Sequence, residues 1–154
     1  MFSREASRQL KAEFWTAFGI FMRQHEPQGG PKIKWVNYQT GVKGIHFRMD
    51  ADQRTASVAI TLEQADPGIR ALFFEQWQEL ETMLHAESGA EWTWQAEHYL
   101  EDGRCISRIS REMHGLSVYD KTNWTELFGF LESCIVPLDE IWGMCQDVFK
   151  DLAD

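Results

Sequence analysis

The sequence predicts a single α+β domain with helices at both ends and antiparallel strands between them. Three observations lead to this class. Apolar residues recur at helical spacing near each terminus, short runs of alternating polarity fill the middle, and glycine- or proline-containing turns separate those runs. The chain of 154 residues has the usual size of one domain, so we expect one domain over residues 1–154. The expected element order is α-β-β-β-α-β-β-α.

The first helix is expected to begin after Ser3, a favourable N-cap residue, and to end near His25. A meander of three strands is expected next, over Lys32–Tyr38, Ile45–Ala51 and Thr55–Glu63. Turn-forming residues separate these runs, and short connections of that kind join antiparallel neighbours.

A second helix is expected from Asp66 to about Gly89, because Asp66-Pro67 combines an N-cap with a proline at the first helical position. A second hairpin follows, with strands from Trp92 to His98 and from Arg104 to Arg111. In its second strand, Ile106 and Ile109 fall on opposite faces. That mismatch predicts a β-bulge or an edge strand.

The C-terminal region Leu127–Leu152 repeats apolar residues at alternating spacings of four and three, the pattern of a heptad seam. Pro137 lies inside it, so we expect a kinked helix or two helices meeting at Val136. A second apolar stripe accompanies the seam, at Phe128, Ile135, Trp142 and Phe149. Two stripes need two covering surfaces, which predicts a homodimer through the C-terminal helical region. In the competing account, the first helix covers the second stripe.

Composition excludes several classes of function. The net charge of -9 opposes a partner bound mainly through phosphates, although a local basic patch remains open. The three cysteines are odd in number and have no CxxC spacing, so we expect reduced thiols in a reducing compartment. Charges interrupt the N-terminal region, and no apolar run approaches about 18 residues. We therefore expect a cytoplasmic protein with no membrane-spanning segment.

Five segments together carry a family resemblance: Lys32–Gly41, Phe47–Ala51, Asp66–Ile69, Leu72–Gln76 and Glu91–Trp94. They resemble the bacterial family called domain of unknown function 4268, and the likeness covers nearly the whole chain. The resemblance implies a short free-standing bacterial protein, while related domains stand at the C-terminus of longer proteins with a nuclease-like N-terminal part. Such context suggests nucleic-acid processing or defence. The family carries no agreed activity, so no catalytic residue can be transferred.

The element order is also similar to a restriction-endonuclease-like core of the PD-(D/E)xK type. In that core an aspartate on the second strand and an acidic-x-Lys on the third strand hold a divalent metal. Asp50 can fill the first place, but the third strand ends in Glu63 and has Ala65 where the lysine belongs. A divergent nuclease would have to use these two carboxylates, with Glu13 from the first helix.

A polar row on the second expected strand is the best candidate for a binding site. His46, Arg48 and Asp50 share one face, with side chains about 7 Å apart along the strand. Such a row is ordinarily a solvated sheet face, but it can hold a small molecule around Arg48 if other polar groups converge there. The candidate binding residues are His46, Arg48, Asp50, Glu63, His98 and Arg108.

Two features of the second hairpin bear on this candidate site. His98 continues the alternation of Trp92 and Trp94, which predicts a hydrogen-bonded histidine at the rim of the core. Arg104, Arg108 and Arg111 can meet an anionic partner, although neighbouring carboxylates make cross-strand ion pairs the ordinary explanation.

The sequence contains no HExxH, Walker, GxSxG, GxGxxG or metal-spaced His/Cys motif. We therefore assign no catalytic residue, no metal ligand and no cofactor. The leading hypothesis is a non-enzymatic interaction or accessory module with a protein partner, linked to nucleic-acid processing or defence. The alternatives are the divergent metal-dependent nuclease and a small-molecule site on the polar sheet face around Arg48.

Overall fold

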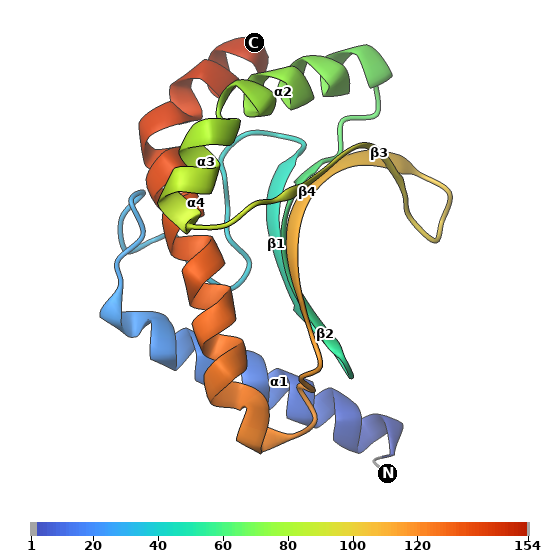
Figure 1. The fold of residues 1–154 in the computed structure, drawn as a ribbon, viewed down its shortest axis with the longest axis vertical. Helices are drawn as coiled ribbons and strands as arrows, with labels where there is room; N and C mark the ends of the chain where they lie inside the picture. The colour runs from blue at the N-terminus through green and yellow to red at the C-terminus, as the bar shows by residue number, and fades with distance from the viewer. Residues whose placement is uncertain (1–2, 154) are drawn as a thin grey trace.

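The computed structural model describes residues 3–153, in which four α-helices pack against one side of an antiparallel sheet (Figure 1). In chain order the elements are α1 (Arg4–Phe21), the 3-10 helix η1 (Met22–Gln24), β1 (Ile45–Ala51), β2 (Thr55–Leu62), α2 (Pro67–Glu79), α3 (Glu81–Ser88), β3 (Thr93–Tyr99), β4 (Cys105–His114), the 3-10 helix η2 (Lys121–Asn123) and α4 (Trp124–Ala153). The α+β class and the order of helices and hairpins agree with the sequence prediction, with one strand fewer.

The sheet has the strand order β1-β2-β4-β3, and every neighbouring pair is antiparallel. Figure 1 shows that the sheet curves strongly, with helices packed against its convex side and the opposite, concave side left open. Because side chains alternate along a strand, each central strand sends one set of residues to the helices and the other to the concave side. On β2 the helix-facing set is Ala56, Val58, Ile60 and Leu62, all fully buried.

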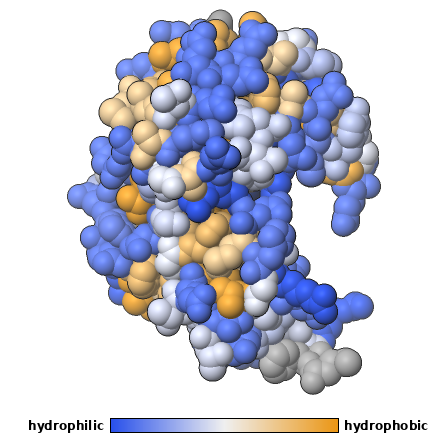
Figure 2. Space-filling view, viewed as in Figure 1, coloured by the Kyte–Doolittle hydropathy of each residue, from blue (hydrophilic) through white to orange (hydrophobic). Residues whose placement is uncertain are grey.

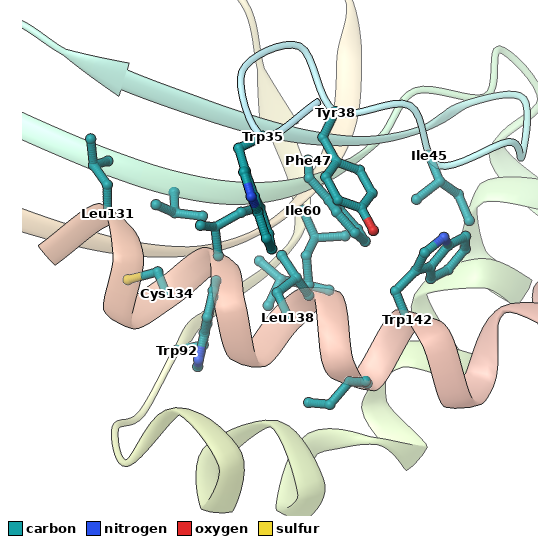
Figure 3. Packing of buried hydrophobic residues seen from close by; sticks show 14 of the residues in the cluster. Trp35, Tyr38, Ile45, Phe47, Ile60, Trp92, Leu131, Cys134, Leu138 and Trp142 are labelled. Carbon is teal, nitrogen blue, oxygen red and sulfur yellow. The ribbon is translucent and has the colours of Figure 1, made fainter. Parts of the chain in front are cut away.

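The helix-facing side of the sheet is covered chiefly by α4, the longest helix. Leu131 and Leu138 point from α4 toward the sheet, and Leu138 lies near Ile60 (Figure 3). Helix α1 adds Phe14 and Phe18, which are fully buried. The core is therefore rich in aromatic rings, as the composition indicates.

The prediction of a strand over Lys32–Tyr38 is wrong. Residues 25–44 form turns and bends instead, and Asn37 has a left-handed backbone with φ of 61°, which no strand accommodates. Trp35 and Tyr38 are both buried, and their spacing of three differs from the alternation that a strand requires. Side-chain donors satisfy two backbone carbonyl groups of this loop. Trp35 Nε1 donates to the His25 carbonyl, and Trp142 Nε1 donates to the Thr40 carbonyl, each at 3.1 Å.

The second helix is divided where one helix was expected. Asp66 caps α2 through hydrogen bonds from the amides of Gly68 and Ile69, but the helix ends at Leu80, whose ψ of 4° is not helical. Helix α3 then takes a new direction (Figure 1) and buries Leu84 completely. The single apolar stripe over Asp66–Gly89 thus belongs to two helices packed against different surfaces.

Helix α4 is continuous through Pro137, so the alternative of two helices meeting at Val136 is wrong. The second stripe is also covered within the chain. Phe128 contacts the rings of Phe14, Phe18 and Phe21 on α1, while the other stripe members Ile135, Trp142 and Phe149 are buried. The exposed stripe on which the dimer prediction depends is therefore absent, because α1 and α2 cover it.

Candidate functional site

The concave side of the sheet is lined mainly by polar side chains. They come from alternate positions of β1, β2 and β4, opposite the positions that build the core. Figure 2 shows the molecule hollowed on this side, with a mostly hydrophilic surface around the hollow. One hollow of about 270 Å³ is lined by Arg48, Asp50, Ser57, Ala59, Thr61, Glu63, His98, Leu100, Arg104, Ile106 and Arg108. Five of the six candidate binding residues thus line the same hollow.

Arg48 and Glu63 form a two-point ion pair across β1 and β2. Arg48 Nε donates to Glu63 Oε2 at 2.8 Å and Nη2 donates to Oε1 at 3.1 Å. The Thr61 hydroxyl also donates to Glu63 Oε2, at 2.6 Å. Burial alone would raise the pKa of Glu63, but the hydrogen bonds from Arg48 and Thr61 hold that pKa below its usual value. The carboxylate therefore stays ionised and fixes the guanidinium in place.

Arg108 lies at the junction of two hollows on this side. It lines the hollow described above and a second one of about 580 Å³ at the β3 edge. Its side chain is only 18% exposed. Nη1 donates to the Ser110 hydroxyl at 3.0 Å and to Glu112 Oε1 at 3.3 Å, while Nε and Nη2 have no partner within residues 3–153. These two groups can therefore bind an external acceptor.

His98 lies on the concave side, so its predicted position at the rim of the core is wrong. Gln95 pairs with Arg108, but His98 pairs with Ile106, which leaves one extra residue in β3. The sequence analysis expects a bulge or an edge strand at the second strand of this hairpin, but the extra residue lies in the first strand, β3, which is the edge strand, while β4 is central. The bulge reverses the alternation that Trp94 begins. The imidazole is thereby placed on the same side as Arg108.

His46 and Asp50 are less well placed than the other candidates. His46 lines a separate hollow of about 480 Å³ at the β1 edge, together with Arg48. Asp50 is exposed and lies 4.0 Å from Lys11 Nζ. It pairs with Ser57, whereas Glu63 follows the far end of β2, about 20 Å away along an extended strand.

The divergent nuclease needs carboxylates around one cation, and the structure separates them. Asp50 and Glu63 lie at opposite ends of the hairpin, and Glu13 is paired with Lys121 at 3.6 Å. Within residues 3–153, no three side chains of His, Cys, Asp or Glu are grouped so that they could hold a metal ion.

A buried carboxylate on the helix side escaped the sequence analysis. Asp139, on α4, is 1% exposed. It accepts a hydrogen bond from the Tyr38 hydroxyl at 2.5 Å and one from the Gln28 amide at 3.0 Å. Burial raises the pKa of Asp139 above its usual value, although both hydrogen bonds oppose the shift. An acidic residue next to Leu138 in the apolar seam is the signal that could have revealed this contact.

Among known families, the domain of unknown function DUF4268 matches residues 10–145. The chain belongs to this family. The match confirms the family resemblance of the five segments and covers every strand of the DUF4268 sheet. The chain matches no curated protein and no solved structure. No helix within residues 3–153 is long and apolar enough to cross a membrane.

Proposed function

We propose that this domain is a non-enzymatic binding module whose concave sheet face holds an anionic group of its ligand. The observation that carries the proposal is Arg108, a largely buried guanidinium with two unpartnered nitrogens at the junction of two hollows. Guanidinium groups pair well with carboxylates and phosphates because their N–H groups match two acceptor oxygens. The hollow of about 270 Å³ suits a group of a few atoms.

The arrangement around Arg108 supports binding without further chemistry. Three arginines reach this side, and each is held by its own carboxylate: Arg48 by Glu63, Arg104 by Asp102, and Arg108 by Glu112. Such pairs orient the guanidinium groups before a ligand arrives, which lowers the entropy lost on binding. His98 adds a ring that can donate or accept a hydrogen bond. None of these residues forms a nucleophile–base pair, which favours the binding role over hydrolysis.

A titration with inorganic phosphate and with citrate tests the proposal. We expect saturable binding at millimolar concentration, with shifts in the NMR signals of the Arg48 and Arg108 side chains. Arg108→Gln should weaken binding about tenfold or more, because a charged hydrogen bond is lost. Arg8→Gln, on the exposed face of α1, is the matched control and should bind as wild type. Equal binding by the two variants, or no binding by the wild type, contradicts the proposal.

A link to nucleic-acid processing or defence is the narrower form of this hypothesis. A terminal phosphate can occupy the same hollow, while the net charge of -9 opposes contact with a long polyanion. A short single-stranded DNA with a 5′-phosphate should therefore bind better than its dephosphorylated form. With Mg²⁺ or Mn²⁺ present we expect neither DNA nor RNA to be cut. Cleavage that Asp50→Ala abolishes would establish the nuclease alternative.

Cytoplasmic location and self-association are also proposals. Free thiols at Cys105, Cys134 and Cys145 support a reducing compartment. The dimer now depends on a smaller apolar surface at the C-terminal end of α4, where Val148 and Leu152 are exposed. Light scattering after size-exclusion chromatography should show twice 18 kDa, and Val148→Glu should give a folded monomer. A wild-type species of 18 kDa refutes the dimer.

A further inference from the structure

Strand β4 is longer than the edge strand that pairs with it. Strand β3 begins at Thr93, opposite Ser110, so Arg111–His114 pair with β2 on one side and with no strand of residues 3–153 on the other. Figure 1 shows β4 continuing beyond the point where the chain crosses from α3 into β3. The segment Arg111–His114 is therefore an open sheet edge.

The backbone groups that face this open edge follow from the ladder. The Gly115 amide donates to the Arg54 carbonyl at 2.8 Å, so the hydrogen bonds to β2 are made by every second residue back along β4, which includes Met113 and Arg111. The N–H and C=O groups of Glu112 and His114 point the opposite way, toward the open edge. Unpaired backbone groups in a row are a template for an added strand.

The helix side of this edge carries an unpaired cation next to apolar surface. The guanidinium carbon of Arg111 lies 5.6 Å from the centre of the Phe130 ring. Its Nη1 is buried and has no hydrogen-bond partner within residues 3–153. Met113 follows on the same face of β4 and is half-buried, and Figure 2 shows hydrophobic side chains on the surface between α4 and β4. Buried donors in proteins are nearly always paired, so an external acceptor would supply the hydrogen bond that Arg111 Nη1 lacks.

The hollow beside the open edge of β4 and the charged side chains that line it can accommodate a negatively charged acceptor. The hollow of about 580 Å³ is lined by Arg111, Glu112 and His114, among others. The carboxylate of Glu112 is already paired, with Arg108 at 3.3 Å and with His114 at 3.4 Å. No carboxylate of residues 3–153 lies within ion-pair distance of Arg111. The positive charge of Arg111 is thus left for a ligand.

We propose that the open edge of β4 binds an extended, acidic peptide segment of a partner protein. The segment adds to the sheet antiparallel to β4, and its main chain pairs with the backbone of Glu112 and His114. Its residue opposite Met113 is apolar, and its residue opposite Arg111 is Asp or Glu. The unpaired guanidinium selects this acidic segment over a neutral one. The proposal is independent of the anion hollow around Arg48.

Two synthetic peptides test the proposal by NMR titration of the full chain. The probe is acetyl-Thr-Val-Thr-Asp-amide, in which Val and Asp face the helix side and which ends before Ser110, where β3 begins; its control has Asn in place of Asp. We expect saturable shifts of the Glu112 and His114 amide signals, with the Asn peptide bound about tenfold more weakly. Arg111→Met should remove the preference for Asp, whereas Arg48→Gln should retain it. Equal affinity of the wild type for both peptides overturns the proposal.

A backbone variant and amide exchange test the edge itself. Glu112→Pro removes an N–H group that faces the open edge but leaves the hydrogen bonds to β2, so binding should be lost while the melting temperature stays near that of the wild type. In the wild type, the Glu112 and His114 amides should exchange rapidly and the Met113 amide slowly. Slow exchange at Glu112 and His114 without peptide, whether from internal pairing or from a second copy of the chain, overturns the proposal.

Discussion

Asp139 and Glu63 lie on opposite sides of the sheet, and their surroundings shift their pKa values in opposite directions. Asp139 is buried in the core and meets only neutral donors, from Tyr38 and Gln28. Glu63 lies beside the concave hollow and meets the charged Arg48. The helix side therefore uses a carboxylate to tie the 25–44 loop to α4. The concave side keeps charges in opposed pairs near solvent, where a ligand can reach them.

The largest expected loss of stability follows from a substitution on the helix side of the sheet, where the core lies. Phe149 is fully buried and contacts the rings of Phe73, Trp77 and Trp142. Phe149→Ala should lower the free energy of unfolding by about 3–5 kcal/mol, because it removes apolar contacts and leaves a cavity. Ser57→Ala, on the concave side, should change it by less than about 0.5 kcal/mol. Urea denaturation measures both, and similar losses would remove the distinction between the two sides.

The next effect concerns the buried contact of Asp139. Asp139→Ala leaves the Tyr38 hydroxyl and the Gln28 amide without their acceptor. Each unsatisfied buried donor costs about 1–3 kcal/mol, so the free energy of unfolding should fall by about 2–4 kcal/mol. Amide exchange in residues 25–44 should also become faster. A loss below about 1 kcal/mol would show that water replaces the carboxylate at no cost.

The two carboxylates should also give opposite dependence of stability on pH. A raised folded-state pKa means that the contribution of Asp139 is full at low pH and is lost as pH rises through that pKa. A lowered pKa means that the contribution of Glu63 is present at neutral pH and is lost as pH falls through its folded pKa.

Denaturation at several pH values separates the two cases. Relative to the wild type, the stability deficit of Asp139→Asn should shrink as pH rises, while that of Glu63→Gln should grow. If both deficits change in the same direction, the contrast between the two environments is wrong.

The smallest expected effect is on stability at the concave side. Arg48 is 56% exposed, so its ion pair with Glu63 is screened by solvent. A double-mutant cycle of Arg48→Gln and Glu63→Gln should give a coupling of less than about 1 kcal/mol. A coupling above about 2 kcal/mol would make the pair a structural element and weaken its assignment as part of a binding site.

Local spacing was sufficient to predict most of the fold. The N-cap at Ser3, the Asp66-Pro67 start and the alternation along β1 and β2 are short-range signals, and the structure contains each element they predict. The segment Lys32–Tyr38 failed because its conformation depends on distant partners. Asp139 and Trp142, about a hundred positions away in the chain, supply hydrogen bonds that no local pattern reveals.

The candidate site was predictable in part for the same reason. Alternation placed Arg48 on the polar face, and the structure brings it to Glu63 and near Arg108 in one hollow. Alternation failed for His98 because a bulge lies between Gln95 and His98. The open edge at Arg111 was also beyond prediction, since it depends on where β3 starts relative to β4.

The bulge in β3 makes the concave side tolerant of a change in chain length. Deleting Ala96 or Glu97 would remove the extra residue and restore regular alternation from Trp94, with His98 still opposite Ile106 on the concave side. A relative shorter by one residue at this point would keep both the fold and the histidine in the hollow. A one-residue gap between Gln95 and His98 in aligned sequences is therefore compatible with the same binding chemistry.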